Sequence, residues 1–181
     1  MDPATQILKV VLVGPRAAGK TTVGMALADT LGWGFRDADD LVAAAVGQPA
    51  EDYLRTAGEA AFREAEEKVV QAAVDESTQE VLALGGGAVL SPAIRDTLRV
   101  ENQGNRLLVV FLRAPVPTLV ERQEAAPRAP LTGTPLRDEV TVLLAARWRY
   151  YVAVSHMQLD TSSANVDACV RSIIAKMGVT S

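Results

Sequence analysis

The chain has 181 residues, of which 49% are apolar and 22% charged, and its formal net charge is −4. This length and composition predict one folded domain with a single core. The acidic balance and the lack of a long Lys/Arg run argue against a nucleic-acid partner. No apolar run reaches the roughly 18–20 residues that span a bilayer, so no membrane partner is expected. The amino terminus does not read as a signal peptide, and Cys169 is the only cysteine, which indicates a cytoplasmic protein without disulfides.

Short apolar runs alternate along the chain with longer segments of helical period, which predicts an α/β fold with a mainly parallel sheet. The expected strands are residues 7–13, 34–37, 81–84, 107–112 and 156–160. The expected helices are 22–31, two between 41 and 76 with breaks near 47–49 and near Gly58, one after Ser91-Pro92, and 116–125, 136–154 and 164–177.

The segment 14–21 fits the phosphate-binding pattern G-x-x-x-x-G-K-[ST] between an expected strand and an expected helix. In this context backbone N–H groups and the helix dipole converge on one point and form an anion site. We expect Lys20 to bridge the outer phosphates of a nucleotide and the Thr21 hydroxyl to hold Mg²⁺. The pattern predicts a nucleotide site without naming the phosphate acceptor.

Three later features lie where an acceptor would bind, and each has a plain structural alternative. Asp37 and Asp39 close the second expected strand, where they either share a face toward the crevice or cap the next helix. Arg63 lies one helical turn before Glu66, a spacing that suits either a ligand-binding arginine or a solvated surface pair. The glycine run 85–87 follows the third expected strand and forms either a close backbone approach to a ligand or a loose turn.

Residues 125–135 contain three prolines and one glycine, which predicts a loop where a mobile lid would close. The second half of the chain is also rich in arginines, and a subset near the crevice would bind a carboxylate or neutralise a transferring phosphate. These candidates are Arg113, Arg122, Arg128, Arg137, Arg147 and Arg149.

Taken in order, the P-loop, Asp-x-Asp, Phe-Arg-x-x-Glu-Glu, Gly-Gly-Gly-Ala-Val, the proline-containing lid and Arg147 resemble the shikimate kinase family over about residues 8–175. The resemblance implies a P-loop, three-layer α/β/α fold like that of nucleoside monophosphate kinases, with a five-stranded parallel sheet and a mobile lid. It implies one domain over residues 1–181, with an acceptor-binding helical part at about 39–76. It further implies phosphorylation of the 3-hydroxyl of shikimate, in aromatic amino-acid biosynthesis, with ATP and Mg²⁺, by a monomer whose partners are small molecules.

The resemblance also implies roles for residues around the acceptor. Asp39 would contact the acceptor hydroxyl and serve as base, and Asp37 would act with Thr21 at Mg²⁺. Arg63 and Arg147 would bind the carboxylate of shikimate, with Arg63 oriented by Glu66. The backbone of Gly86 and Gly87 would contact the substrate.

On the nucleotide side, the resemblance makes Lys20 and Arg128 catalytic and places Arg122 near adenine. The implied nucleotide contacts are Gly14, Ala17, Ala18, Gly19, Lys20, Thr21, Thr22, Arg122 and Arg128. The chain departs from the family pattern at Ala17, where glycine is usual, and at residues 161–165, which lack the usual basic and proline residues. The lid is the third departure: its arginine falls at Arg128 or at position 129, and we favour Arg128 because one residue of slack in a loop costs little.

Two alternative functions remain. Another small-molecule kinase, for gluconate or a nucleoside monophosphate, is disfavoured by the Arg63–Glu66 pair and the glycine run 85–87. A nucleotide-binding regulatory module without transfer activity is disfavoured by the presence of Lys20 together with both aspartates.

Overall fold

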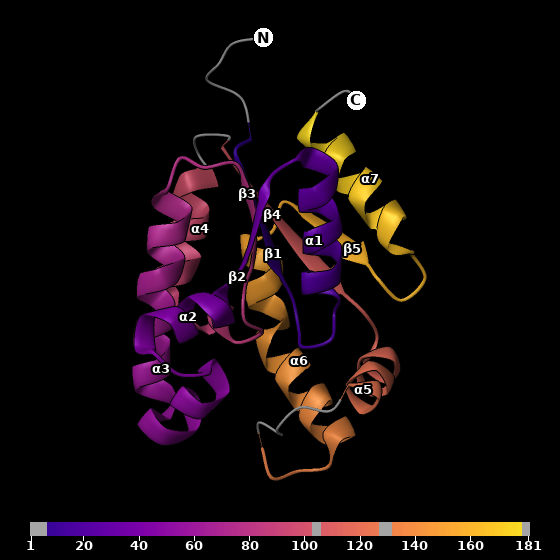
Figure 1. Ribbon diagram of the computed structural model, residues 1–181. Coiled ribbons are helices and arrows are strands. Elements are labelled where there is room, and N and C mark those ends of the chain that lie inside the picture. Colours follow the sequence, from indigo (N-terminus) through magenta and orange to yellow (C-terminus); the bar gives the residue numbers. More distant parts are fainter. Residues whose placement is uncertain (1–6, 103–105, 127–131, 179–181) are drawn as a thin grey trace.

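The computed structural model describes residues 7–102, 106–126 and 132–178 (Figure 1). Within these residues, five strands form one parallel sheet in the order β2-β3-β1-β4-β5. Their bounds are β1 (Lys9–Val13), β2 (Gly34–Asp37), β3 (Glu80–Ala83), β4 (Leu107–Arg113) and β5 (Met157–Asp160). The helices are α1 (Lys20–Leu31), α2 (Ala38–Val46), α3 (Ala50–Asp75), α4 (Pro92–Asn102), α5 (Val116–Ala125), α6 (Leu136–Val154) and α7 (Val166–Met177), with a 3₁₀ turn η2 (Ala88–Leu90).

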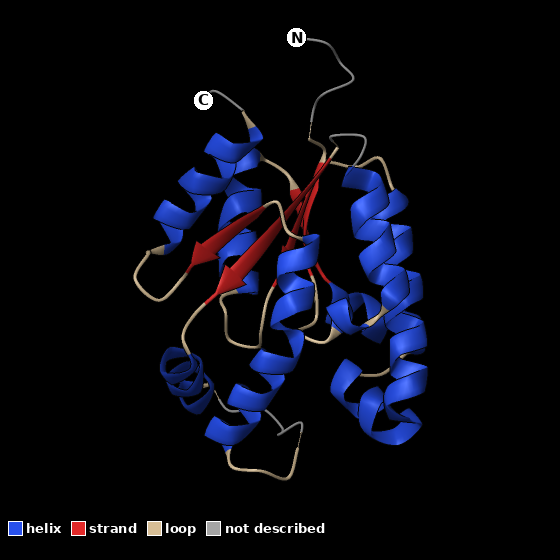
Figure 2. Cartoon of the chain, turned by 180° about the vertical axis from the view of Figure 1, so that it is seen from behind, coloured by secondary structure: helices blue, strands red, loops and turns tan. Residues whose placement is uncertain are grey.

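Helices cover both faces of the sheet, as the two opposite views show (Figures 1 and 2). The central strand β1 is buried along its whole length, and its side chains alternate between two cores. Val11 and Val13 pack with residues of α3, α4 and α6. Val10 and Leu12 pack with residues of α1 and α7. A strand buried on both sides reads as a continuous apolar run, so the expectation of a three-layer α/β/α fold is confirmed.

The long helix α3 is bent at Gly58, which has φ 86° and ψ 167°. This conformation lies in the left-handed half of the map, where a side chain is strained and glycine is not. The predicted break near Gly58 is therefore present as a kink, and the turn of α3 before it lies beside α2 (Figure 1).

A buried group of charges joins the starts of β1 and β3. Lys9 and Glu80 are register partners, are 3% and 4% exposed, and form an ion pair. The Arg36 guanidinium also donates to Glu80, with Nε 2.5 Å from Oε2. Burial raises the pKa of Glu80, but the hydrogen bonds from Arg36 and Lys9 outweigh burial and hold it below its usual range. This group lies outside the candidate site and ties three strands to one carboxylate.

Candidate functional site

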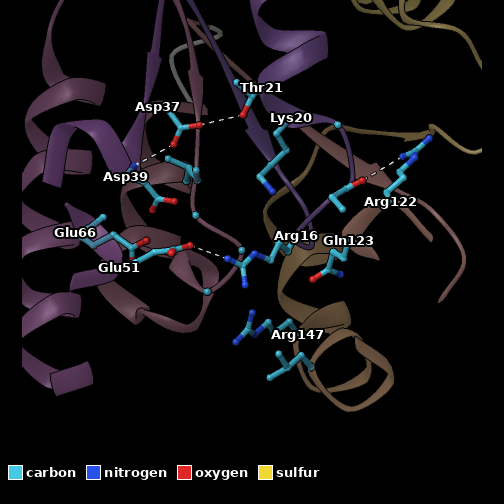
Figure 3. A pocket seen from close by; sticks show the side chains of 18 of the residues that line it. Arg16, Lys20, Thr21, Asp37, Asp39, Glu51, Glu66, Arg122, Gln123 and Arg147 are labelled. Carbon is cyan, nitrogen blue, oxygen red and sulfur yellow. Dashed lines mark hydrogen bonds and ion pairs between the residues drawn. The ribbon is translucent and has the colours of Figure 1, made fainter. Parts of the chain in front are cut away.

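A cleft of about 1060 Å³ opens beyond the carboxyl ends of the strands, the place where open parallel sheets bind ligands. Most of the residues expected from the sequence line it (Figure 3). They are Ala17, Gly19, Lys20, Thr21, Thr22, Asp37, Asp39, Arg63, Gly86, Gly87, Arg122 and Arg147. Gly14 and Ala18 belong to the same P-loop but do not line the cleft. Arg128 and Ala129, the two choices of lid register, lie outside the described residues.

The P-loop turns tightly between β1 and α1. Gly14 has φ 148°, and a Cβ there would lie 2.2 Å from the Leu112 carbonyl oxygen, so only glycine fits. Gly19 caps α1 with φ 90°. The Lys20 ammonium, at the first position of α1, donates to the carbonyls of Gly14 at 3.0 Å and Pro15 at 2.9 Å. The lysine therefore lies over the loop whose N–H groups would bind phosphate.

Ala17 adopts φ 63° and is the one non-glycine residue with positive φ in the described part of the chain. It stands where glycine is usual in the family pattern. The backbone keeps the left-handed conformation that suits glycine, and the alanine side chain is therefore strained there. The Arg122 guanidinium donates to the Ala17 carbonyl at 3.2 Å and to the Thr161 carbonyl at 2.6 Å. Thr161 in turn donates to the Ala18 carbonyl at 3.0 Å. Arg122 thus fixes the strained loop against the segment that follows β5.

The two aspartates come together by a different route from the one expected. Strand β2 ends at Asp37 and α2 begins at Ala38, so Asp39 lies in the first turn of a helix and not on the strand. Asp37 is the N-cap, and its Oδ1 accepts the Asp39 N–H at 3.1 Å. The expectation that both aspartates share one strand face is wrong, because the chain turns into α2 directly after Asp37. The alternative, that an aspartate caps the next helix, holds for Asp37.

The second oxygen of Asp37 accepts a hydrogen bond from the Thr21 hydroxyl at 3.2 Å. A hydroxyl and a carboxylate at the mouth of a phosphate-binding loop match the chemistry of Mg²⁺, which takes oxygen ligands from one or two side chains and completes its shell with phosphate and water. Thr21 and Asp37 therefore fit the ion expected from the sequence.

Arg63 is held by a buried carboxylate. Its Nη1 donates to Glu66 Oε2 at 2.5 Å, and the Glu66 side chain is 1% exposed. Burial raises the pKa of Glu66, and the Arg63 charge opposes that rise. Within the described residues, Arg63 Nε and Glu66 Oε1 are buried without a hydrogen-bond partner. A buried carboxylate thus holds the guanidinium in place, and the alternative of a solvated surface pair is excluded.

The glycine run fills the space beside these groups. A Cβ on Gly87 would come within 2.2 Å of Arg63 Nη2, and one on Gly85 within 2.7 Å of Glu66 Oε1. Side chains cannot enter at these two positions without displacing the arginine or its carboxylate. Backbone consequently forms the floor of the cleft here, as the close-approach interpretation of residues 85–87 requires.

Sequence reasoning missed two residues at this site. Arg16 lies within the P-loop and donates to Glu51, at the start of α3, at 2.7 Å across the cleft (Figure 3). Its position inside the motif was a visible signal, but no role was predicted for it from the sequence. Tyr151, on α6 one turn after Arg147, had no sequence signal, since nothing marks which tyrosine of the pair 150–151 turns inward.

Comparison with known proteins identifies similar chains. The family model described as "SKI: Shikimate kinase" matches residues 16–178. The chain is 39% identical over 171 residues to "Shikimate kinase 2" of Escherichia coli O81 (strain ED1a), covering 91% of this chain and 94% of that one. It is 38% identical over 173 residues to "Shikimate kinase" of Mycobacterium avium (strain 104), covering 95% and 94%. The solved structure of shikimate kinase from Acinetobacter baumannii in complex with shikimate is similar with a TM-score of 0.85 and 29% identity, covering 96% and 94%.

Proposed function

The chain belongs to the shikimate kinase family, whose members phosphorylate shikimate with ATP, and we propose that the cleft divides into a nucleotide half at the P-loop and an acceptor half at Asp39, Arg63 and Arg147. One observation supports this division above all. The cleft brings a phosphate-binding loop, a carboxylate and two arginines together within one cavity. A kinase needs these groups to transfer a phosphoryl group to the hydroxyl of a substrate that also carries a carboxylate.

In the nucleotide half, the backbone N–H groups of the P-loop bind the phosphates of ATP, with Ala17, Ala18, Gly19 and Thr22 beside them. Lys20 leaves the Gly14 and Pro15 carbonyls and contacts the outer phosphates. Thr21 and Asp37 would hold Mg²⁺, which neutralises phosphate charge when bound. Phosphoryl transfer passes through a loose transition state, so these groups act by positioning and by charge neutralisation.

In the acceptor half, Arg63 and Arg147 bind the carboxylate of the substrate, and the backbone of Gly86 and Gly87 lies against its ring. Asp39 accepts a hydrogen bond from the reacting hydroxyl and aligns it with the phosphate. The Arg63 guanidinium supports this role, because it lines the cleft while the buried Glu66 carboxylate holds its Nη1 in place.

Two further assignments rest on the sequence. Arg128, in a lid at about 125–135, would add a positive charge at the transferring phosphate, and lid closure would exclude water as a competing acceptor. Arg122 would border adenine from its place beside the P-loop. The protein would act as a single-domain cytoplasmic monomer on small-molecule substrates. Among the residues that the structure describes, no helix has the length and apolar character needed to cross a membrane.

The acceptor is tested by measuring ADP release with shikimate, gluconate and CMP in parallel. We expect release with shikimate alone. Release with gluconate or CMP would favour another small-molecule kinase. No ADP release with any of the three would favour a regulatory nucleotide-binding module.

The role of Asp39 is tested by Asp39→Asn, which preserves size but removes the charge and the basicity. We expect kcat for shikimate phosphorylation to fall strongly, while ATP binding measured by calorimetry changes little. The matched control is Asp40→Asn, because Asp40 follows in the same turn of α2 and does not line the cleft. An unchanged kcat in Asp39→Asn would refute the assignment.

A further inference from the structure

Tyr151 is a fully buried tyrosine behind the acceptor half of the cleft. Its ring stacks on Phe111 of β4, with centroids 5.0 Å apart and planes at 25°, and its exposed fraction is 0%. Stacking in a close-packed core fixes the plane of the ring and therefore the position of the phenolic oxygen. That oxygen lies among polar groups of the candidate site, although the ring belongs to the core.

The Tyr151 hydroxyl donates to the carbonyl oxygen of Gly86 at 2.5 Å. The described part of the chain contains no cis peptide, and in a planar trans peptide the C=O of one residue and the N–H of the next point in opposite directions. Fixing the Gly86 carbonyl therefore fixes the direction of the Gly87 N–H. The hydroxyl thus sets the orientation of a whole peptide group in the glycine run.

Arg147 lies beside the same glycine. Arg147 precedes Tyr151 by one turn of α6, so the two side chains lie on the same side of the helix. The Arg147 Nη1 would lie 3.7 Å from a Cβ on Gly86, so the guanidinium lies beside the glycine whose carbonyl the hydroxyl binds. A hydroxyl that donates its one proton to Gly86 keeps its lone pairs for a donor such as the neighbouring Arg147 guanidinium. Burial raises the pKa of Tyr151 to about 12, so the proton is present throughout the neutral range.

From these contacts, and resting on the acceptor site assigned above, we propose that Tyr151 is a positioning residue for the acceptor. One hydroxyl holds the Gly86–Gly87 peptide and the Arg147 guanidinium at a fixed distance from each other. These are two of the groups assigned to shikimate, so their relative position determines how well the acceptor binds. Tyr151 itself contacts neither substrate.

The test is Tyr151→Phe, which keeps the ring and its stacking on Phe111 and removes only the oxygen. A neutral hydrogen bond contributes about 0.5–1.5 kcal/mol, so we expect the KM for shikimate to rise roughly two- to thirteenfold. The KM for ATP should not change, because both groups that the hydroxyl holds belong to the acceptor half of the cleft. Thermal unfolding is followed by circular dichroism in parallel.

Tyr150→Phe is the matched control. Tyr150 is the preceding residue of α6 and does not line the cleft. Its hydroxyl accepts a hydrogen bond from Arg149 Nη2 at 2.6 Å. We expect this variant to keep both KM values. A lower Tm of Tyr151→Phe with an unchanged shikimate KM would overturn the inference, because Tyr151 would then contribute to stability alone. Equal rises in the KM of both substrates would also overturn it. Failure of the proposed function is distinguishable, since wild-type protein would then release no ADP with shikimate, and both proposals would fall.

Discussion

Replacing Arg63 by lysine is the sharpest test of the acceptor half of the cleft. The guanidinium donates through Nη1 to Glu66, its Nη2 lies close to Gly87, and its Nε is buried without a partner among the described residues. One planar group can thus contact Glu66 on one side and a substrate carboxylate on another. A lysine ammonium is a single point charge on a flexible stem and cannot make a two-point contact in the same place.

The expected size of the effect follows from this geometry. Arg63→Lys conserves the charge and removes the second charge-assisted hydrogen bond to the substrate. Such a bond contributes about 1.5–3 kcal/mol, which corresponds to a roughly ten- to hundredfold higher KM for shikimate. The KM for ATP should remain near its wild-type value, since Arg63 lies in α3 and not in the P-loop.

Initial rates of ADP release, with each substrate varied in turn, measure both constants. Arg55→Lys is the matched control, because Arg55 also belongs to α3, pairs with Asp52 and has a side chain that is 76% exposed. We expect this control to behave as wild type. If Arg63→Lys lowers Tm and raises both KM values equally, Arg63 is a structural partner of Glu66, and the reasoning is refuted.

Three further predictions concern the P-loop and the buried charges. Lys20→Ala should abolish turnover with an unchanged far-UV circular dichroism spectrum, and near-normal turnover would contradict the phosphate role of Lys20. Ala17→Gly should raise the free energy of unfolding in urea by about 0.5–1 kcal/mol, because glycine relieves the left-handed strain but gains freedom in the unfolded chain; a loss of stability would contradict strain at this residue. The pKa of Glu80 is below its unfolded value of 4.5, so its contribution to stability is present above that pH and is lost as the pH falls below it. Glu80→Gln should leave Lys9 buried without its countercharge and cost about 3–5 kcal/mol at pH 7, with a flatter pH dependence in acid; an equal pH dependence in both proteins would exclude Glu80 as its source.

The sequence predicted the fold well because each layer has a local signature. Strands β1 and β4 are continuous apolar runs, which is typical of strands covered on both faces. The kink of α3 was visible because Gly58 interrupts a helical period. Where a boundary depended on one residue the prediction was less good: the aspartates were read as the end of a strand, although the first of them caps a helix.

Contacts between distant segments could not be predicted in this way. Lys9 and Glu80 are 71 residues apart and meet only because β1 and β3 are neighbours in register. In the sequence Lys9 merely interrupts an apolar run. The inward orientation of Tyr151 depends on the ring of Phe111 and on the Gly86 carbonyl, neither of which is adjacent in the chain. Periodicity describes one element at a time and does not contain such pairings.

The glycine floor of the cleft also bears on inhibition. A compound that binds the backbone of residues 85–87 and the Arg63 guanidinium contacts main-chain atoms, which substitution can hardly alter, and a side chain that is assigned to acceptor binding. A side chain at position 87 would collide with Arg63, and one at position 85 with Glu66, so a change that excludes the compound also disturbs acceptor binding. We therefore expect resistance mutations against such a compound to be rare at the floor and to arise instead at Glu51 and other exposed residues of the rim.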